Sequence, residues 1–233
     1  RELSILGGNE FIKPKAKFRD NNYHIVERNL DFARHLGISP ANIEFPLPET
    51  SQETKNNVNS LMISLDSSKP TMIISPATTW ANKHWSEGNW AKLIESIDEK
   101  CNLVFTGTEE NKELIENILN KTTRYIRHTN LAGKTNVEEL RELFSRAKIV
   151  ISPDSGSTHL AWASSKPIVI TIFTCTPAKR FGPYGNDDKY FSIQANLPCQ
   201  PCFKRKCQRD EDKNICQSYP SADEIINIVN KLL

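Results

Sequence analysis

Four short apolar runs, separated by longer stretches of helical periodicity, constrain the fold of this chain more than any other feature. The runs are rich in Ile and Val and read TMIIS (71–75), NLVFTG (102–107), KIVIS (148–152) and PIVITIF (167–173). Apolar runs of this length, without alternating polar residues, are typical of strands buried on both faces of a parallel sheet. Strands that alternate with helices predict a doubly wound, Rossmann-like α/β domain with helices on both faces of the sheet.

The segments between these runs carry apolar residues at helical spacing, and three helices are expected to begin near Ser86, Glu109 and Asn136. Asn136 and Glu139 have the spacing of a capping box, in which side chains and backbone N–H groups bond in both directions. A last helix is expected in SADEIINIVNKLL (221–233). The apolar stripes of the first three helices are Trp90, Leu93, Ile94 and Ile97; Leu114, Ile115, Ile118 and Leu119; and Val137, Leu140, Phe144 and Ala147.

The residues before the first apolar run differ in character and predict a domain boundary. YHIVERNLDFARHLGIS (23–39) has the pattern of a helix that stops at Gly37, and a stretch rich in Pro and polar residues follows it. Residues 1–46 are too few to bury a core of their own, so we expect the end of a preceding domain and its interdomain helix. Residues 47–68 would then be a linker and a first helix, and residues 69–233 the sheet domain. The start lacks a Met and reads like the middle of a longer protein.

Charge and hydropathy exclude several classes of function. The net charge is only +2, from 30 basic and 28 acidic residues, so no global field points to nucleic acid as a partner. No apolar run approaches the roughly 20 residues of a membrane span. Because the sequence shows no secretion signal, we expect a cytoplasmic protein without obligatory disulfides.

Small and polar residues follow the third apolar run, where a parallel sheet binds its ligands. A helix that begins at Ser155 or Gly156 would point free N–H groups at an anion, and the small residues would let a phosphate approach the backbone. His159, one turn further on, could donate to a phosphate oxygen. Asp154 would cap the helix or accept a hydrogen bond from a hydroxyl, since it would repel a phosphate. Alternatively, Asp154 is only an N-cap and His159 only a helix residue.

Two other strand ends add candidates. Thr78 and Thr79 offer hydroxyls and Lys83 an ammonium before the helix near Ser86, a combination that suits a diphosphate. After the second run, Glu109 or Glu110 could accept both hydroxyls of a ribose. The alternatives are a solvated loop lysine and acids that merely favour a helix start. No GxGxxG follows any run, so a dinucleotide site is not predicted.

The cysteines fall into two groups. Cys101 and Cys175 stand beside apolar runs, and we expect them to be small buried hydrophobic residues, just as we expect Trp85 and Trp90 to pack against the sheet. The other four form Cys199-x2-Cys202-x4-Cys207-x8-Cys216, with a basic cluster, CFKRKCQR, among them. All-cysteine zinc sites exist, but this spacing fits only half of a zinc pattern, so we expect no metal. A disulfide pair or free thiols are the other readings.

Taken in order, TTWANKHWSEGNWAKL, VFTGTEEN, NLAGKTNVEELRELFSRAKIVISPDSGSTHLAWA, and RFGPYG followed by LPCQPCFKRKC resemble the ADP-heptose:lipopolysaccharide heptosyltransferases of glycosyltransferase family 9. The resemblance extends from about residue 70 to the end, and HIVERNLDFARHLGI looks like the end of the family's first domain. It implies a GT-B fold, two Rossmann-like domains that face each other, of which this chain would hold the C-terminal, nucleotide-sugar-binding half. The acceptor site, the Gly-rich loop and the general base of the first domain would then be missing here.

The reaction implied by the resemblance is inverting transfer of heptose from ADP-heptose to the lipid A-core acceptor, without metal or cofactor, in the cytoplasm or at the inner face of the inner membrane. Catalytic roles would fall to Lys83, Asp154 and His159, because the anionic leaving group needs protein donors. The implied substrate-binding set is Thr78, Thr79, Lys83, Glu109 (ribose), Thr135 (adenine), Asp154, Ser155, Gly156 and His159.

Two other functions stay open from the sequence. The chain could bind an ADP-sugar without transferring it. It could instead be another GT-B enzyme, such as a UDP-N-acetylglucosamine epimerase, which would prefer UDP over ADP. The KHW element at 83–85 and the late cysteine loop argue against the epimerase.

Overall fold

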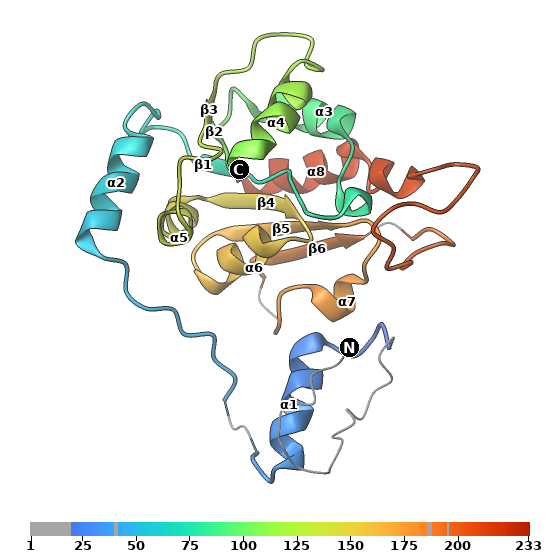
Figure 1. Ribbon diagram of the computed structural model, residues 1–233. Coiled ribbons are helices and arrows are strands. Elements are labelled where there is room, and N and C mark those ends of the chain that lie inside the picture. Colours follow the sequence, from blue (N-terminus) through green and yellow to red (C-terminus); the bar gives the residue numbers. More distant parts are fainter. Residues whose placement is uncertain (1–19, 40–41, 186–187, 195) are drawn as a thin grey trace.

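The computed structural model describes residues 20–39, 42–185, 188–194 and 196–233. It contains a parallel sheet in the order β3-β2-β1-β4-β5-β6, covered by helices on both faces (Figure 1). Four strands confirm the four predicted runs, and β3 and β6 were not predicted. The bounds are β1 (Thr71–Ile74), β2 (Asn102–Phe105), β3 (His128–Asn130), β4 (Ile149–Pro153), β5 (Ile168–Phe173) and β6 (Tyr190–Gln194).

The centre of the sheet lies between β1 and β4, where the strand order changes direction. Met72 pairs with Ile149, and Ile74 pairs with Ile151. Every residue of both strands is buried, which explains why their sequences are mostly apolar. Crevices at such a reversal, beyond the carboxyl ends of the strands, are where doubly wound sheets bind ligands.

Successive side chains of β1 enter different cores because a strand alternates its faces. Met72 and Ile74 join the core that also holds Trp85 and Trp90, whereas Ile73 joins the core beneath Phe144. Trp85 and Trp90 pack as predicted, with ring centroids 4.8 Å apart. The first face carries α3 (Glu87–Ile97), α4 (Lys112–Leu119) and α8 (Ala222–Leu232), and the second carries α2 (Gln52–Met62), α5 (Val137–Arg146) and α6 (Gly156–Ala163).

Local capping fixes the predicted helix starts. Ser86 Oγ accepts from the backbone of Asn89 at 3.2 Å and begins α3. Asn136 and Glu139 form the predicted capping box at α5. The helix expected near Glu109 begins as a short 3₁₀ turn, η2 (Glu109–Asn111), before α4. The remaining short helices are η1 (Ala81–Lys83), α7 (Ala178–Phe181) and η3 (Ile215–Ser218).

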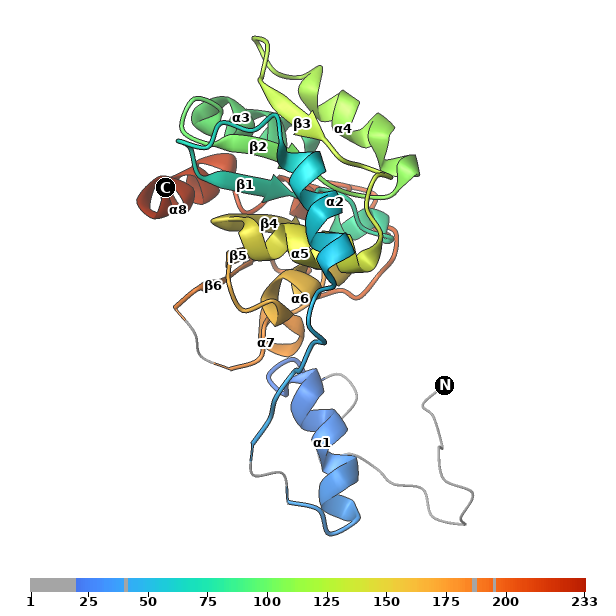
Figure 2. The same ribbon diagram turned by 90° about the vertical axis from the view of Figure 1, so that its left-hand side faces the viewer.

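Helix α1 (Ile25–His35) stands apart from the sheet, and the described residues 42–51 before α2 form neither helix nor strand (Figures 1 and 2). Gly37 has a φ of +79° just beyond its end, in agreement with the predicted stop. Its first turn contacts the sheet domain, where His24 Nε2 donates to the carbonyl of Gly182 at 2.9 Å and Glu27 accepts from the Tyr184 hydroxyl. The boundaries at residues 46 and 68 stay predictions, and residues 1–19 lie outside the described residues. None of the helices in the described ranges is long and apolar enough to cross a bilayer.

Candidate functional site

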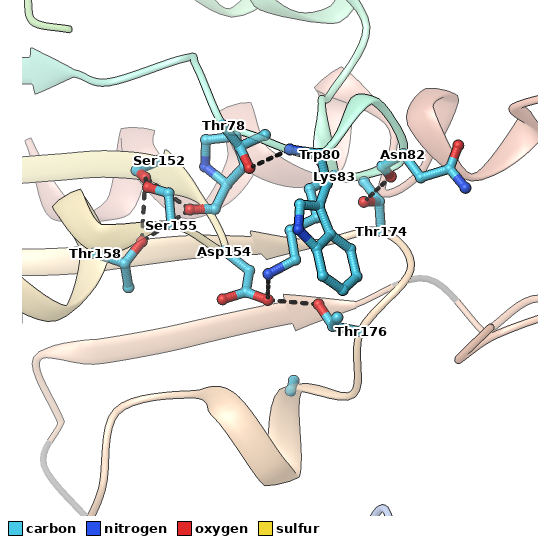
Figure 3. Close-up of polar contacts among 12 residues, drawn as sticks. Thr78, Trp80, Asn82, Lys83, Ser152, Asp154, Ser155, Thr158, Thr174 and Thr176 are labelled. Atoms are coloured by element: carbon cyan, nitrogen blue, oxygen red, sulfur yellow. Dashed lines mark hydrogen bonds and ion pairs between the residues drawn. The ribbon is translucent and has the colours of Figure 1, made fainter. Parts of the chain in front are cut away.

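The loops that follow β1 and β4 meet at the reversal point of the sheet. Ser75, directly after β1, donates its backbone N–H to the carbonyl of Ile151 at 3.0 Å, so the two strand ends lie side by side. The β1 loop carries Thr78, Thr79 and Lys83, and the β4 loop carries Asp154 and the start of α6. The sheet order therefore brings two of the predicted groups of residues together (Figure 3).

An ion pair between Lys83 and Asp154 joins the two loops. Lys83 Nζ lies 2.7 Å from Asp154 Oδ2, and the side chains are only 17% and 7% exposed. The same Oδ2 accepts a hydrogen bond of 2.6 Å from the Thr176 hydroxyl, at the end of β5. The alternative of a solvated Lys83 is therefore wrong. Asp154 is not the N-cap either, because Ser155 occupies that position.

Hydrogen bonds of the neighbouring buried residue Asn82 fix the turn that carries Lys83. Asn82 is only 1% exposed, and its Nδ2 donates to the carbonyl of Lys204 at 2.9 Å. The Thr174 hydroxyl donates to the Asn82 carbonyl at 2.6 Å. Lys83 Nζ also lies 4.9 Å from the centre of the Trp80 ring, within the range of a cation–π contact. With these contacts in place, the ammonium points toward Asp154.

The start of α6 leaves its backbone open to a ligand. Ser155 Oγ pairs with Ser152 Oγ at 2.9 Å instead of capping the helix. Among the described residues, no side chain accepts from the first-turn N–H groups of α6, which lie at the positive end of the helix. Gly156 is exposed, and a Cβ built on it would meet no atom within 4 Å. The predicted helix start and its free approach are both present.

The two threonines of the β1 loop differ in their surroundings. Thr79 is exposed, whereas Thr78 is half-buried. Thr78 Oγ1 accepts from the Trp80 backbone at 3.5 Å, and the Thr78 carbonyl pairs with His84 Nε2 at 2.9 Å. Thr78 therefore shapes the turn, and Thr79 presents the more accessible hydroxyl.

His159 is exposed on α6 and lines a hollow of about 430 Å³ that Trp162, Phe45 and His24 also border. Crowding in this hollow removes part of the hydration of the ring and lowers the pKa of His159 below its usual value. Asp154 opposes that shift, and Lys83 and His24 add to it. A neutral His159 near pH 7 carries one N–H donor, which can serve an anionic ligand or a hydroxyl.

Glu109 and Thr135 lie in two loops that touch beyond β2 and β3. Gly133 donates its backbone N–H to the carbonyl of Gly107 at 2.9 Å. A Cβ on Gly133 would come within 2.1 Å of Glu109 Oε2, and its φ of +75° also favours glycine. The Glu109 carboxylate, 66% exposed, pairs with Lys112. Glu109, and not the neighbouring Glu110, therefore faces the loop that leads to Thr135.

Sequence reasoning missed three residues of the site, namely Trp80, Asn82 and Thr176. Thr176 lies three residues beyond β5, so the preference of ligands for the carboxyl ends of parallel strands also points to it. Asn82 gives no sequence signal, because its importance comes from burial against a distant loop.

All six cysteines are free thiols, including the four in the cysteine loop (Cys199, Cys202, Cys207 and Cys216). Cys101 and Cys175 are buried as predicted, and burial raises the pKa of each thiol to about 12. Within the described ranges, which include all four loop cysteines, no group of three His, Cys, Asp or Glu side chains is arranged to hold a metal ion. The zinc and disulfide readings of Cys199, Cys202, Cys207 and Cys216 gain no support from this geometry.

Comparison with known proteins identifies the chain's relatives. The family model described as glycosyltransferase family 9 (heptosyltransferase) matches residues 11–212. The lipopolysaccharide core heptosyltransferase OpsX of Haemophilus influenzae is 30% identical over 173 residues, covering 73% of this chain and 48% of that protein. Lipopolysaccharide heptosyltransferase 1 of Pseudomonas aeruginosa is 24% identical over 82% of this chain and 52% of its own length. The chain thus spans about half the length of the curated relatives it matches.

Solved structures support the fold. The Escherichia coli ADP-heptose lps heptosyltransferase II superposes with a TM-score of 0.66 at 20% identity, over 83% of this chain and 55% of that one. The E. coli heptosyltransferase WaaC with ADP gives 0.59 at 20% identity, over 91% and 57%. The predicted fold class, a Rossmann-like parallel sheet that forms the C-terminal half of a GT-B glycosyltransferase, is confirmed. Since the family model spans most of the sequence, the chain belongs to glycosyltransferase family 9.

Proposed function

We propose that this chain binds ADP-heptose in the crevice between the β1 and β4 loops and takes part in inverting transfer of the heptose to the lipid A-core of lipopolysaccharide. The observation that carries the proposal is the Lys83–Asp154 pair beside the open start of α6, at the reversal point of the sheet. The family relationship supports the choice of donor, because relatives that match this chain are lipopolysaccharide heptosyltransferases.

The Lys83 ammonium and the first N–H groups of α6 would bind the diphosphate from two sides. As the glycosidic bond breaks, negative charge grows on the leaving ADP, and donors already in position stabilise that charge without reorganisation. Asp154 keeps Lys83 oriented through the 2.7 Å contact. In the described part of the chain, Asp154 Oδ1 carries no hydrogen bond, so it is available to accept one from a hydroxyl of the sugar.

The nucleoside would lie over the ends of β2 and β3. Glu109 would accept the ribose hydroxyls, and the backbone near Thr135 would meet the adenine. Gly133 supports this arrangement, since only a residue without a Cβ leaves room for Glu109. Thr78 and Thr79 would add hydroxyl donors to the diphosphate, and the N–H of His159 would serve a phosphate or the transferred sugar.

A lipid acceptor implies a reaction at a membrane surface. We place it at the inner face of the inner membrane, with the protein as a peripheral, cytoplasmic partner of that surface. The general base that activates the acceptor hydroxyl is not assigned to any residue of this chain.

Calorimetric titration of the full chain with ADP and with UDP tests the donor site. Tighter binding of ADP is expected, whereas a preference for UDP would favour the epimerase. Release of ADP from ADP-heptose, measured with and without a lipid A-core acceptor, then separates transfer from binding alone. Acceleration by the acceptor is the result expected of a transferase. No detectable affinity for ADP would reject the proposed function.

A further inference from the structure

We propose that Arg205 is a second cation of the diphosphate site and acts together with Lys83 on the leaving ADP. This inference rests on the proposed function. It assigns a binding role to one residue, Arg205, of the basic cluster CFKRKCQR (202–209). The physical basis is one indole ring, that of Trp80, which both cationic groups contact.

The Trp80 ring contacts both cations. The Lys83 ammonium lies 4.9 Å from the centre of the ring, and the Arg205 guanidinium carbon lies 5.5 Å from it. Both distances are within the roughly 6 Å over which the face of an aromatic ring attracts a cation. The Trp80 ring lies beside the Lys83 side chain, whose ammonium points to Asp154 (Figure 3). Arg205 is therefore held next to the residue that the proposed function places on the diphosphate.

Asn82 fixes the position of the Arg205 loop relative to Lys83. Its side chain donates to the carbonyl of Lys204 at 2.9 Å, and its backbone N–H donates to the carbonyl of Arg205 at 3.3 Å. Asn82 is the immediate neighbour of Lys83 and is 1% exposed. The two cations are thus coupled through one buried residue, although they lie far apart in the sequence.

The guanidinium of Arg205 is available for a ligand. Among the described residues, no hydrogen bond or ion pair engages it, and its one ring interaction is the cation–π contact with Trp80. Arg124 shows the contrast, because its guanidinium is occupied by both carboxylate oxygens of Asp98 at 2.6 Å. Arg209, in the same loop as Arg205, donates to the carbonyl of Glu211. Arg205 therefore presents a planar set of donors, at the rim of the site, that matches phosphate oxygens.

A second cation would help to stabilise the negative charge that develops on the leaving ADP. The leaving ADP gains charge at its terminal phosphate when the glycosidic bond breaks. Lys83 must share its ammonium with Asp154 at 2.7 Å, so it neutralises that charge only in part. We expect Arg205, from the loop of the basic cluster, to add positive charge at the second phosphate without disturbing the Lys83–Asp154 pair.

The test compares ADP and AMP binding to the full chain and to the Arg205→Ala variant by calorimetry at low and at moderate salt. We expect Arg205→Ala to weaken ADP binding by about 5- to 20-fold, somewhat less than a fully buried charge-assisted hydrogen bond would give. AMP binding should change less than twofold, and the salt dependence of ADP binding should decrease. Arg205→Lys should recover part of the affinity. Arg209→Ala, which makes the same substitution in the same loop, should bind ADP like the unsubstituted chain.

Several results would overturn the proposal. Equal ADP affinities for Arg205→Ala and the unsubstituted chain would do so, and so would an equal loss for ADP and AMP, which would indicate that Arg205 only supports the shape of the loop. Unchanged ADP affinity with a raised KM for the acceptor would assign Arg205 to the acceptor instead. Absence of ADP binding by the unsubstituted chain would contradict the proposed function itself. Thermal unfolding of each variant checks that the exposed substitutions leave the fold intact.

Discussion

Lys83 and Asp154 are joined by a contact of 2.7 Å that connects the loop after β1 to the loop after β4. The pair has two consequences. It holds an ammonium at the reversal point of the sheet before any ligand arrives, and it satisfies a carboxylate that is almost completely buried. We therefore expect substitutions at these two residues to change both the affinity for ADP and the free energy of unfolding, and the variants below separate the two effects.

Replacement of Lys83 by Ala should weaken ADP binding by about 1.5–3 kcal/mol, or about 10- to 150-fold, the scale of a hydrogen bond to a charged group. Calorimetric titration measures the loss. Lys148→Ala is the matched control, because Lys148 precedes β4 at the opposite end of the sheet and donates to the carbonyl of Leu233. Equal affinity in the Lys83→Ala variant and the unsubstituted chain would remove Lys83 from the site.

The same Lys83→Ala substitution should also lower the free energy of unfolding, by about 1–3 kcal/mol, because it leaves a buried carboxylate with one remaining donor, Thr176. The double variant Lys83→Ala/Asp154→Asn removes that unpaired charge and should recover most of the loss. Urea denaturation of the single and double variants measures the coupling. A double variant that is less stable than Lys83→Ala alone would show that the carboxylate is stabilised by something other than Lys83.

Gly156→Val should abolish measurable ADP binding while it preserves the fold. The added side chain meets no protein atom near its Cβ, so it extends into the space that the diphosphate needs at the start of α6. Gly88→Val is the control, since Gly88 lies in the first turn of α3 and its Cβ would also meet nothing within 4 Å. Normal ADP affinity in Gly156→Val would mean that the ligand does not approach this helix terminus.

The central strands could be predicted because burial on both faces leaves a continuous apolar run, as in β1 and β4. The two edge strands carry no such signal. Residues 128–130 are His, Thr and Asn and are only half-buried, and β6 is partly exposed along its length. The sequence pattern therefore predicted the four inner strands of the sheet and missed the two edge strands, β3 and β6.

Some residues of the site could likewise be predicted from the sequence, and others could not. Strand ends and helix starts are local features, so Lys83, Asp154 and Gly156 could be chosen from the sequence. Their partners depend on contacts between distant segments. The sequence gives no distance between Trp80 and Arg205, and none between Asn82 and Lys204, because those contacts follow from how the cysteine loop folds back onto η1.

Gly133→Ala should weaken nucleotide binding and destabilise the fold by about 1–2 kcal/mol, the cost of placing an L-residue in the left-handed region. The loss of affinity arises because the new Cβ would displace the Glu109 carboxylate. Gly37→Ala is the control: Gly37 also has a positive φ, +79°, but its Cβ would meet nothing within 4 Å. Calorimetry with ADP should therefore separate the two variants even if their unfolding free energies fall equally. Similar ADP affinities for the two variants would argue against a ribose-binding role of Glu109.

Alkylation should distinguish Cys207 from the buried thiols. Backbone N–H groups of Asn214 and Arg209 lower the pKa of Cys207, whereas burial raises the pKa of Cys216 to about 11 and that of Cys175 to about 12. Because the thiolate is the reactive form, iodoacetamide at pH 7 should modify Cys207 well before the buried thiols. Mass spectrometry of the peptides at successive times measures the order. Since the Cys207 loop also carries Arg205, ADP should slow this labelling if ligand binding orders the loop. Early modification of Cys175 would instead show that the end of β5 opens to solvent, which would conflict with the tight packing around Asp154 and Thr176.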